Sequence, residues 1–128
     1  MSLTNKKVFQ VDGDELRSLF DNKKYGREGR EENIKRAQDI AKFISSTNHD
    51  VVVSLVSPYL ELREAFKSQM GDNLIELYVY TDEVRCRESF HTDEYEKPTS
   101  NFIDVNTTNE TPEETINFIL DKLNLYYK

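Results

Sequence analysis

The run Val51-Val-Val-Ser-Leu-Val56 constrains the fold of this chain more than any other stretch. Its nearly continuous β-branched side chains are typical of a strand that is buried on both faces, as the central strands of parallel sheets are. A parallel neighbour can be reached only through a crossover connection, which is usually a helix. The run therefore predicts an α/β fold in which this segment is a central strand.

Three further apolar runs have strand character, and helical patterns separate the four. The strand-like runs are residues 8–11, 74–80 and 102–105. Apolar residues at three- and four-residue spacing predict helices after Asp14, over residues 30–47, over residues 59–70, through residues 84–87 and after Thr111. Strands that alternate with helices indicate parallel βαβ units. We therefore expect a single domain, residues 1–128, built as a three-layer α/β sandwich with a mostly parallel sheet.

Polar motifs follow each predicted strand. They are Asp12-Gly-Asp14, Ser57-Pro-Tyr59, Thr81-Asp82 and Asn106-Thr-Thr108. The first contains a natural N-cap, and Ser57-Pro58 predicts a helix that begins with Ser as N-cap and Pro at the first helical position. Because ligands bind at the carboxyl ends of strands in open α/β sheets, we expect the motifs to converge on one functional edge. Residues 21–29, rich in Lys, Arg and Gly, predict a mobile, surface-exposed loop.

The net charge and the cysteine content limit which classes of binding partner and which cellular compartment we expect. The net charge of −7, from 17 Lys and Arg against 24 Asp and Glu, argues against a general nucleic-acid binder, which needs a basic face. A single cysteine, Cys86, excludes an internal disulfide and a cysteine-based zinc site, and it fits a reducing compartment. His49 and His91 have no partners at ligand spacing, so no metal site is predicted. Without a long apolar run or a signal-peptide pattern, we expect a cytoplasmic protein with no membrane partner.

Four motifs in order resemble those of the adenylylsulfate (APS) kinase family. The segment Asp12-Gly-Asp-Glu-Leu-Arg17 is similar to the family's D-G-D-N-x-R, and Arg30-Glu-Glu-Asn-Ile-Lys-Arg36 is similar to its R-x-x-N-I-x-R. The segment Val53-Ser-Leu-Val-Ser-Pro-Tyr59, followed by Arg63, looks like its strand that ends in S-P-Y. Residues 77–87, 95–98 and 103–107 look like its C-terminal half. Each motif is weak by itself, but the ordered set is specific.

The resemblance implies a P-loop fold and a kinase that transfers the γ-phosphate of ATP, with Mg²⁺, to the 3′-hydroxyl of APS in sulfate assimilation. It also implies roles for particular residues. Arg17, Arg30 and Asn33 would hold the phosphosulfate and the nucleotide, because arginine forks pair with phosphate and sulfate oxygens. The backbone at Val56 and Ser57 would line the same pocket. Asp14 would be the catalytic acid beside the attacking hydroxyl and Mg²⁺.

Two departures from the family pattern concern ATP. None of the four glycines, at positions 13, 26, 29 and 71, begins the signature G-x-x-x-x-G-K-[ST] whose amides and lysine cradle ATP phosphates. Only residues 89–94 stand where the family has its basic lid. Glu15 also replaces the family's usual Asn. We therefore expect a sheet without the family's first strand. Either residues 51–56 and 74–80 pair directly, which we favour, or a partner chain fills or caps the slot between them. We also expect a protein that binds a nucleotide or anion without transferring phosphate alone.

Other interpretations stay open. The chain could be an active APS kinase whose P-loop comes from another chain or from a missing N-terminal segment, or a non-enzymatic interaction module on the same scaffold. A homo-oligomer is also open. From position alone, Asp12 and Asp14 are more often a turn and cap pair than catalytic groups. The arginines at 17, 30, 36 and 63 could be solvated charges that pair with nearby glutamates, which stabilises little.

Overall fold

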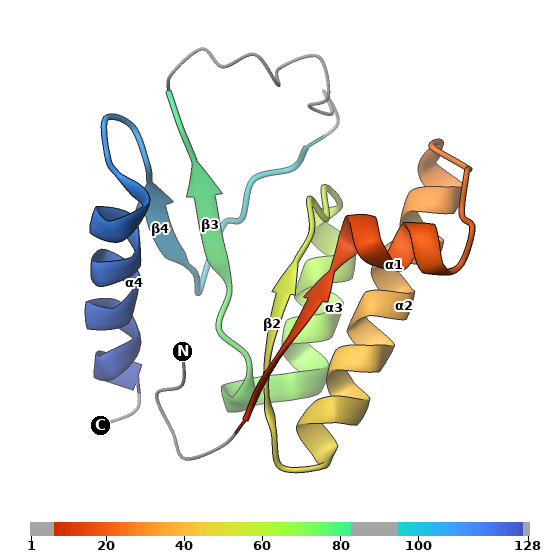
Figure 1. The fold of residues 1–128 in the computed structure, drawn as a ribbon, viewed down its shortest axis with the longest axis horizontal. Helices are drawn as coiled ribbons and strands as arrows, with labels where there is room; N and C mark the ends of the chain where they lie inside the picture. Colours follow the sequence, from red (N-terminus) through yellow and green to blue (C-terminus); the bar gives the residue numbers. More distant parts are fainter. Residues whose placement is uncertain (1–6, 83–94, 127–128) are drawn as a thin grey trace. The chain divides into compact units, whose positions relative to one another are not determined.

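The computed structural model describes residues 7–82 and 95–126 (Figure 1). The chain divides into two compact units, Met1–Met70 and Gly71–Lys128, and each is described by itself. The helix expected through residues 84–87 lies outside the described residues. The single domain expected over residues 1–128 stays a prediction.

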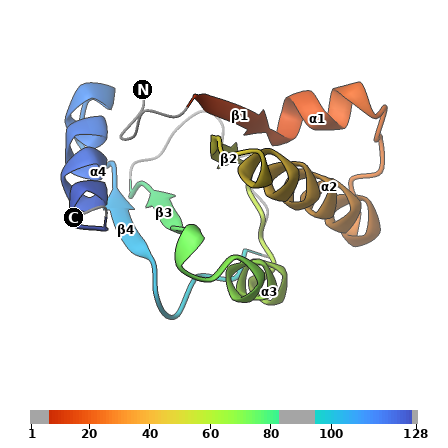
Figure 2. The same ribbon diagram turned by 90° about the horizontal axis from the view of Figure 1, so that it is seen from below.

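The first unit is a pair of parallel strands with three helices. Its elements are β1 (Val8–Asp12), α1 (Gly13–Leu19), α2 (Arg27–Ser46), β2 (Asp50–Ser54) and α3 (Leu60–Met70). The strands β1 and β2 run parallel in a register that pairs Val8 with Asp50 and Asp12 with Ser54. Figure 2 shows α2 running alongside both strands, with which it is in contact. The predicted βαβ unit is therefore confirmed here.

A small apolar core joins these elements. Val11 on β1 and Leu16 on α1 are buried, and α2 contributes Ile34, Ala37 and Ala41, which recur at the spacing of one helix face. Ala37 is fully buried, so at this point the helix lies directly against the sheet. The half-buried side chains that pack against this core are Ile40, Ile44, Val51, Val53 and Leu55.

The expected burial of residues 51–56 on both faces is wrong. Strand β2 spans Asp50–Ser54, and its side chains alternate between half-buried and exposed. Val52 is 52% exposed and Val56 is 65% exposed. The side chains of a strand alternate between the two faces of its sheet, and the inward set here packs under α2 while Val52 does not. The run correctly predicted a strand, but it did not predict that one face of the strand is exposed.

The second unit contains another parallel pair. Its elements are the short 3₁₀ helix η1 (Gly71–Asn73), β3 (Leu77–Tyr80), β4 (Ile103–Asn106) and α4 (Pro112–Tyr126). Ile103 and Val105 are buried, and α4 contacts β4. The predicted start of the last helix is confirmed, since the Thr111 hydroxyl accepts the Glu114 N–H at 3.2 Å. Ile116 on α4 is 43% exposed.

Each of the two units contains one pair of parallel strands. Among the described residues, β1 pairs with β2 and β3 pairs with β4, both in parallel. The direct pairing of residues 51–56 with 74–80 that we expected would join the two units, so it stays a prediction. The α/β class with parallel strands is confirmed. Of the helices within the described residues, none combines the length and apolar character needed to cross a membrane.

A tyrosine of the second unit has a testable ionisation. The Tyr80 hydroxyl donates to the Asp104 carboxylate at 2.9 Å. This hydrogen bond, followed by desolvation and the charge of Asp104, raises the pKa of Tyr80 above its ordinary value of about 10. Because the folded pKa is raised, the contribution to stability is present below the ordinary pKa and is lost as pH rises through the raised value.

We therefore expect an ultraviolet titration of phenolate formation to lose its most alkaline step in a Tyr80→Phe variant. Asp104→Asn should move that step to lower pH, because it removes the charge and weakens the hydrogen bond. A Tyr80 step unchanged in Asp104→Asn would contradict the assignment.

Candidate functional site

The turn between β1 and α1 holds the first predicted site residue. Asp12 is the N-cap of α1, and its Oδ1 accepts the N–H of Asp14 at 2.9 Å, as the sequence predicted. The Asp14 side chain is exposed in the first turn of the helix. Gly13 is buried, and a Cβ added there would lie 2.9 Å from the Cβ of Leu55. The turn with Asp14 therefore lies directly against the segment that follows β2.

Asn33 joins α2 to this turn. Its side chain is 7% exposed, and its Nδ2 donates to the backbone carbonyl of Gly13 at 3.1 Å. That bond fixes the orientation of the amide, because only the nitrogen end can donate to a carbonyl. The Oδ1 of Asn33 is buried and has no hydrogen-bond partner among the described residues. A buried acceptor without a donor is costly, so we expect a donor beyond the described residues.

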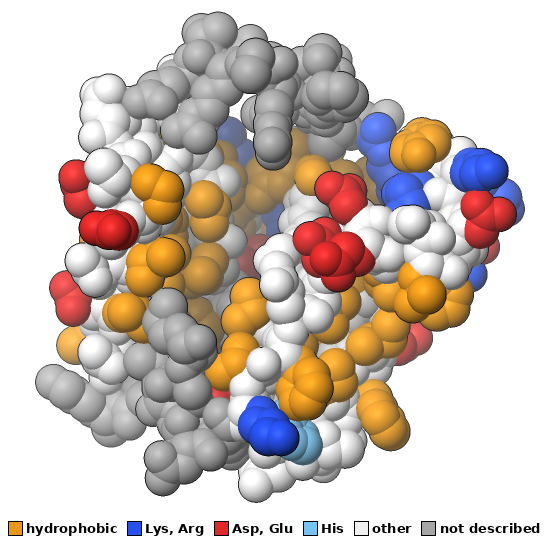
Figure 3. Space-filling view, in the orientation of Figure 1, with side chains coloured by type: hydrophobic (Ala, Val, Ile, Leu, Met, Phe, Trp, Pro, Cys, Tyr) orange, Lys and Arg blue, Asp and Glu red, His pale blue; other side chains and the backbone are white. Residues whose placement is uncertain are grey.

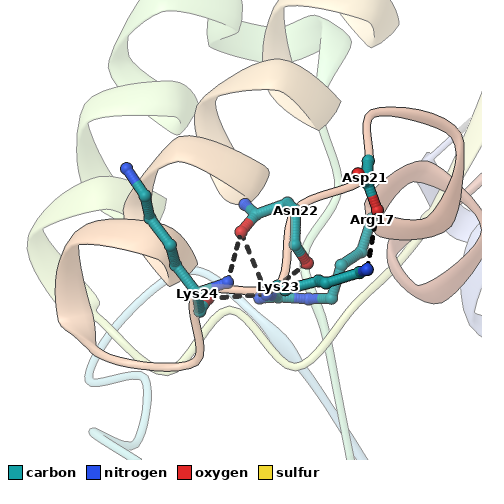
Figure 4. Close-up of polar contacts among 5 residues, drawn as sticks. All are labelled: Arg17, Asp21, Asn22, Lys23 and Lys24. Atoms are coloured by element: carbon teal, nitrogen blue, oxygen red, sulfur yellow. Dashed lines mark hydrogen bonds and ion pairs between the residues drawn. The ribbon is translucent and has the colours of Figure 1, made fainter.

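Arg17 lies one turn after Asp14 on α1 and is held by the next loop. Its Nη1 donates to the carbonyls of Lys24 at 2.7 Å and Asn22 at 3.3 Å, and to the Asn22 Oδ1 at 3.4 Å (Figure 4). The guanidinium also lies 4.8 Å from the centre of the Tyr25 ring. These partners are neutral, so they orient the positive charge without cancelling it. The alternative of a solvated charge paired with a glutamate does not describe Arg17.

The loop that holds Arg17 is largely exposed, as expected, but two of its residues, Asn22 and Gly29, are buried. Asn22 is 7% exposed; its Nδ2 donates to the Gly29 carbonyl at 3.0 Å, and its Oδ1 accepts the Lys24 N–H at 3.0 Å. Gly29 is buried inside α2, which begins at Arg27 and not at Arg30. The polar composition of the loop did not indicate that Asn22 is buried, because an asparagine whose amide bonds to buried backbone groups is the same residue type as an exposed asparagine.

Arg30 and Ser57 complete the predicted set from two other elements. Arg30 is half-buried in the first turn of α2, one turn before Asn33. Ser57 has a left-handed backbone with φ of 42°, and its carbonyl accepts Nη1 of Arg63 at 2.6 Å. The expected N-cap role of Ser57 is wrong, because α3 begins at Leu60. Val56 beside it is 65% exposed.

The structure therefore assembles part of the predicted site within the first unit. Pairing of Asp12 with Ser54 brings the carboxyl ends of β1 and β2 to one edge. Asn33 bonds to the turn that carries Asp14, and the loop that binds Arg17 packs on Gly29, next to Arg30. Figure 3 shows acidic and basic side chains gathered over α1 and its connection to α2.

Arg27, in the same region, differs from Arg17 because its charge is paired with a carboxylate. Its Nε donates to Glu31 at 2.8 Å, and this hydrogen bond is the main cause that raises the pKa of Arg27. Its guanidinium also lies 4.3 Å from the centre of the ring of Tyr59, which is 1% exposed. Arg27 is thus neutralised by a carboxylate, whereas the hydrogen bonds of Arg17 go to neutral acceptors.

Two other features do not contribute to this site. A cavity of about 230 Å³ beside β1 is lined mainly by apolar side chains of β1, α1 and α2, which suit packing and not anion binding. Across residues 7–82 and 95–126, no group of three or more His, Cys, Asp and Glu side chains could hold a metal ion.

Comparison with known proteins gives the site its context. The sequence profile of the family described as adenylylsulphate kinase matches residues 1–119. An adenylyl-sulfate kinase of Pseudomonas aeruginosa is 32% identical over an alignment of 124 positions, which covers 92% of this chain and 63% of that protein. The chain thus spans less than two thirds of this relative's length. A cytidine diphosphoramidate kinase of Campylobacter jejuni is 25% identical over 143 residues, covering 98% of this chain and 84% of the relative.

A solved structure agrees at the level of the fold. The APS kinase of Mycobacterium tuberculosis in complex with AMPPNP and APS superposes with a TM-score of 0.74 at 19% identity, covering 93% of this chain and 81% of that one. The match confirms the α/β fold that the sequence predicted. Since the family profile covers residues 1–119 of the 128, this chain belongs to the adenylylsulphate kinase family.

Proposed function

We propose that the first unit binds APS or a similar adenosine phosphate at the β1–α1 turn. The observation that carries the proposal is the buried Oδ1 of Asn33, which has no donor among the described residues and belongs to a side chain that bonds to Gly13, next to Asp14. A hydroxyl or amino group of a nucleotide would supply that donor. The oriented charge of Arg17 in the same unit suits the anionic part of such a ligand.

Each residue of the site has a role in this proposal. Arg17 and Arg30 bind the phosphosulfate oxygens, and Asn33 accepts a hydrogen bond from a nucleotide hydroxyl or amine. Val56 and Ser57 line the pocket through their backbone. Asp14, whose carboxylate is exposed, orients the hydroxyl that would attack a phosphoryl group.

Mg²⁺ and ATP enter the proposal only for the phosphoryl-transfer reaction. Mg²⁺ keeps several waters and is usually held by one or two carboxylates together with substrate phosphates. The exposed carboxylate of Asp14 fits that kind of partner without a built cage, and the ion would neutralise charge on the transferred group. The residues of the chain itself bind and orient the acceptor nucleotide.

We further propose that these 128 residues by themselves bind the acceptor nucleotide but do not transfer phosphate. No glycine in the sequence begins the pattern G-x-x-x-x-G-K-[ST], so the usual cradle for ATP phosphates is not among these residues. Sulfate assimilation is the setting that follows if APS is the ligand.

An active kinase is the second candidate, and one observation favours it. The chain covers 63% of the length of the Pseudomonas aeruginosa relative, so further residues or a second chain could supply the ATP site. The mass of the natural protein, compared with its complete reading frame, separates this candidate from the first. A third candidate, an interaction module, requires that no nucleotide binds.

A binding experiment can also identify which nucleotide is the acceptor. The Campylobacter jejuni relative acts by its name on a cytidine diphosphoramidate, so a cytidine ligand is the main competitor of APS. Calorimetric titration with APS, CDP, ADP and ATP, each with and without Mg²⁺, ranks them. We expect APS to bind most tightly, and tighter binding of CDP would move the substrate class to cytidine nucleotides.

Replacing Arg17 or Arg30 with alanine is expected to weaken APS binding by roughly 1.5–3 kcal/mol, or about 10- to 150-fold, as for other hydrogen bonds to charged groups. Calorimetry on each variant measures the loss. Lys35→Ala is the matched control, because it removes one positive charge from an exposed position of α2. Lys35→Ala should change the affinity less than threefold. Equal affinities for Arg17→Ala, Arg30→Ala and the parent chain would remove the site assignment.

A further inference from the structure

We propose that Asn22 is a positioning residue that aims the guanidinium of Arg17 at the anionic group of the ligand. The inference rests on the proposed function, in which Arg17 binds that group. Asn22 contacts Arg17 through both backbone and side chain. The Asn22 N–H donates to the Arg17 carbonyl at 2.9 Å, and the Asn22 carbonyl and Oδ1 accept from Nη1 of Arg17 at 3.3 and 3.4 Å.

The contacts of Asn22 also explain why this orientation is rigid. Its side chain is 7% exposed and spans the loop, with Nδ2 bonded to the Gly29 carbonyl at 3.0 Å and Oδ1 bonded to the Lys24 N–H at 3.0 Å. A donor at one end and an acceptor at the other leave a single orientation for the amide. The Lys24 carbonyl, the shortest partner of Arg17 at 2.7 Å, is held in place by the same amide.

The way Arg17 is anchored leaves its ligand-binding edge open. Within the described residues, every hydrogen bond of the Arg17 guanidinium uses Nη1. The N–H groups of Nη2 and Nε are therefore available as donors. These two nitrogens form the side-on pair that binds a carboxylate, phosphate or sulfate bidentately. The Tyr25 ring packs near the guanidinium at 4.8 Å. Asn22 thus restricts the rotation of a group whose free edge is the binding edge.

Two measurements test the proposal on the 128-residue chain. Nitrogen-15 NMR of the Arg17 side chain, without ligand, reports rotation of the guanidinium, and calorimetry reports APS affinity. In the parent chain we expect restricted rotation of the Arg17 guanidinium compared with free arginine. In Asn22→Ala we expect faster rotation and APS binding weakened about three- to tenfold. Asn48→Gly is the control, because Asn48 is exposed in the same unit and has a left-handed backbone that suits glycine.

A double-mutant cycle separates positioning from a general structural role. If Asn22 acts through Arg17, Asn22→Ala should cost little further affinity in a chain that already carries Arg17→Ala. Fully additive losses would overturn the proposal, as would a parent guanidinium that rotates like free arginine, a result that needs no variant to fold. If the parent chain does not bind APS, the proposed function fails, while the NMR comparison still decides whether Asn22 fixes Arg17.

Discussion

Replacing Gly29 with alanine is expected to lower the free energy of unfolding by about 1–3 kcal/mol, the usual range for an overpacked site. An added Cβ would lie 2.1 Å from the Lys24 carbonyl oxygen and 2.7 Å from its carbonyl carbon, which is closer than atoms can approach. The loop backbone must therefore move. Because Lys24 accepts from Arg17 and donates to Asn22, that movement breaks hydrogen bonds as well.

Helix propensity alone predicts the opposite sign. Gly29 lies within α2, where alanine is favoured over glycine by about 1 kcal/mol. Steric overlap should win, because the obstacle is backbone and not the flexible end of a side chain. Urea denaturation measures the outcome, with Gly26→Ser as the control. A Cβ at Gly26 would meet nothing within 4 Å, and serine is a good residue for that N-cap position.

The same substitution should also weaken APS binding, since it displaces the carbonyl that anchors Arg17. Gly26→Ser should leave both stability and affinity close to the parent values. A Gly29→Ala chain that is about 1 kcal/mol more stable than the parent would show that propensity outweighs packing here, and that Lys24 is free to move.

The second large effect concerns phosphoryl transfer. We expect these 128 residues alone to phosphorylate APS at a rate far below the roughly 1–100 s⁻¹ that is typical of kinases. Phosphoryl transfer depends almost entirely on positioning and on stabilising charge in the transition state, and the glycine-rich cradle with its lysine is not in this sequence. A coupled assay that follows ADP release from ATP in the presence of APS measures the rate.

The assay needs a positive control, for which the Pseudomonas aeruginosa relative is suitable. Turnover by the 128 residues within the typical kinase range would contradict the prediction and would require another phosphate cradle. If the natural reading frame is longer, the same assay on the complete protein distinguishes an active enzyme from a nucleotide-binding relative. Binding of APS without turnover in both forms would support the first candidate.

Local sequence patterns predicted the elements of this fold well. The cap at Asp12, the helix start at Thr111 and the strand character of residues 51–56 each depend on interactions within a few residues, so they can be recognised without tertiary structure. The family motifs also predicted the fold class, because four of them occur in the order found in the family.

The sequence did not predict features that depend on distant contacts. Whether Val52 is covered is decided by neighbours that the apolar pattern does not name. Asn22 looked like an ordinary loop residue, because its burial follows from the packing of Lys24 on Gly29. The start of the helix after Ser57 was predicted two residues early, because Ser-Pro has the same sequence signature whether or not the helix begins there.

The bond between Asn33 and the Gly13 carbonyl connects residues that are 20 positions apart in the chain. It ties the first turn of α1 to a point inside α2, one turn beyond Arg30. Asp14 and Arg30 therefore lie on two helices, α1 and α2, that this hydrogen bond connects. The bond thus limits how far apart Asp14 and Arg30 can move. Under the proposed function, the ligands that fit would be those in which the distance from the hydroxyl to the anionic group matches the separation of Asp14 and Arg30.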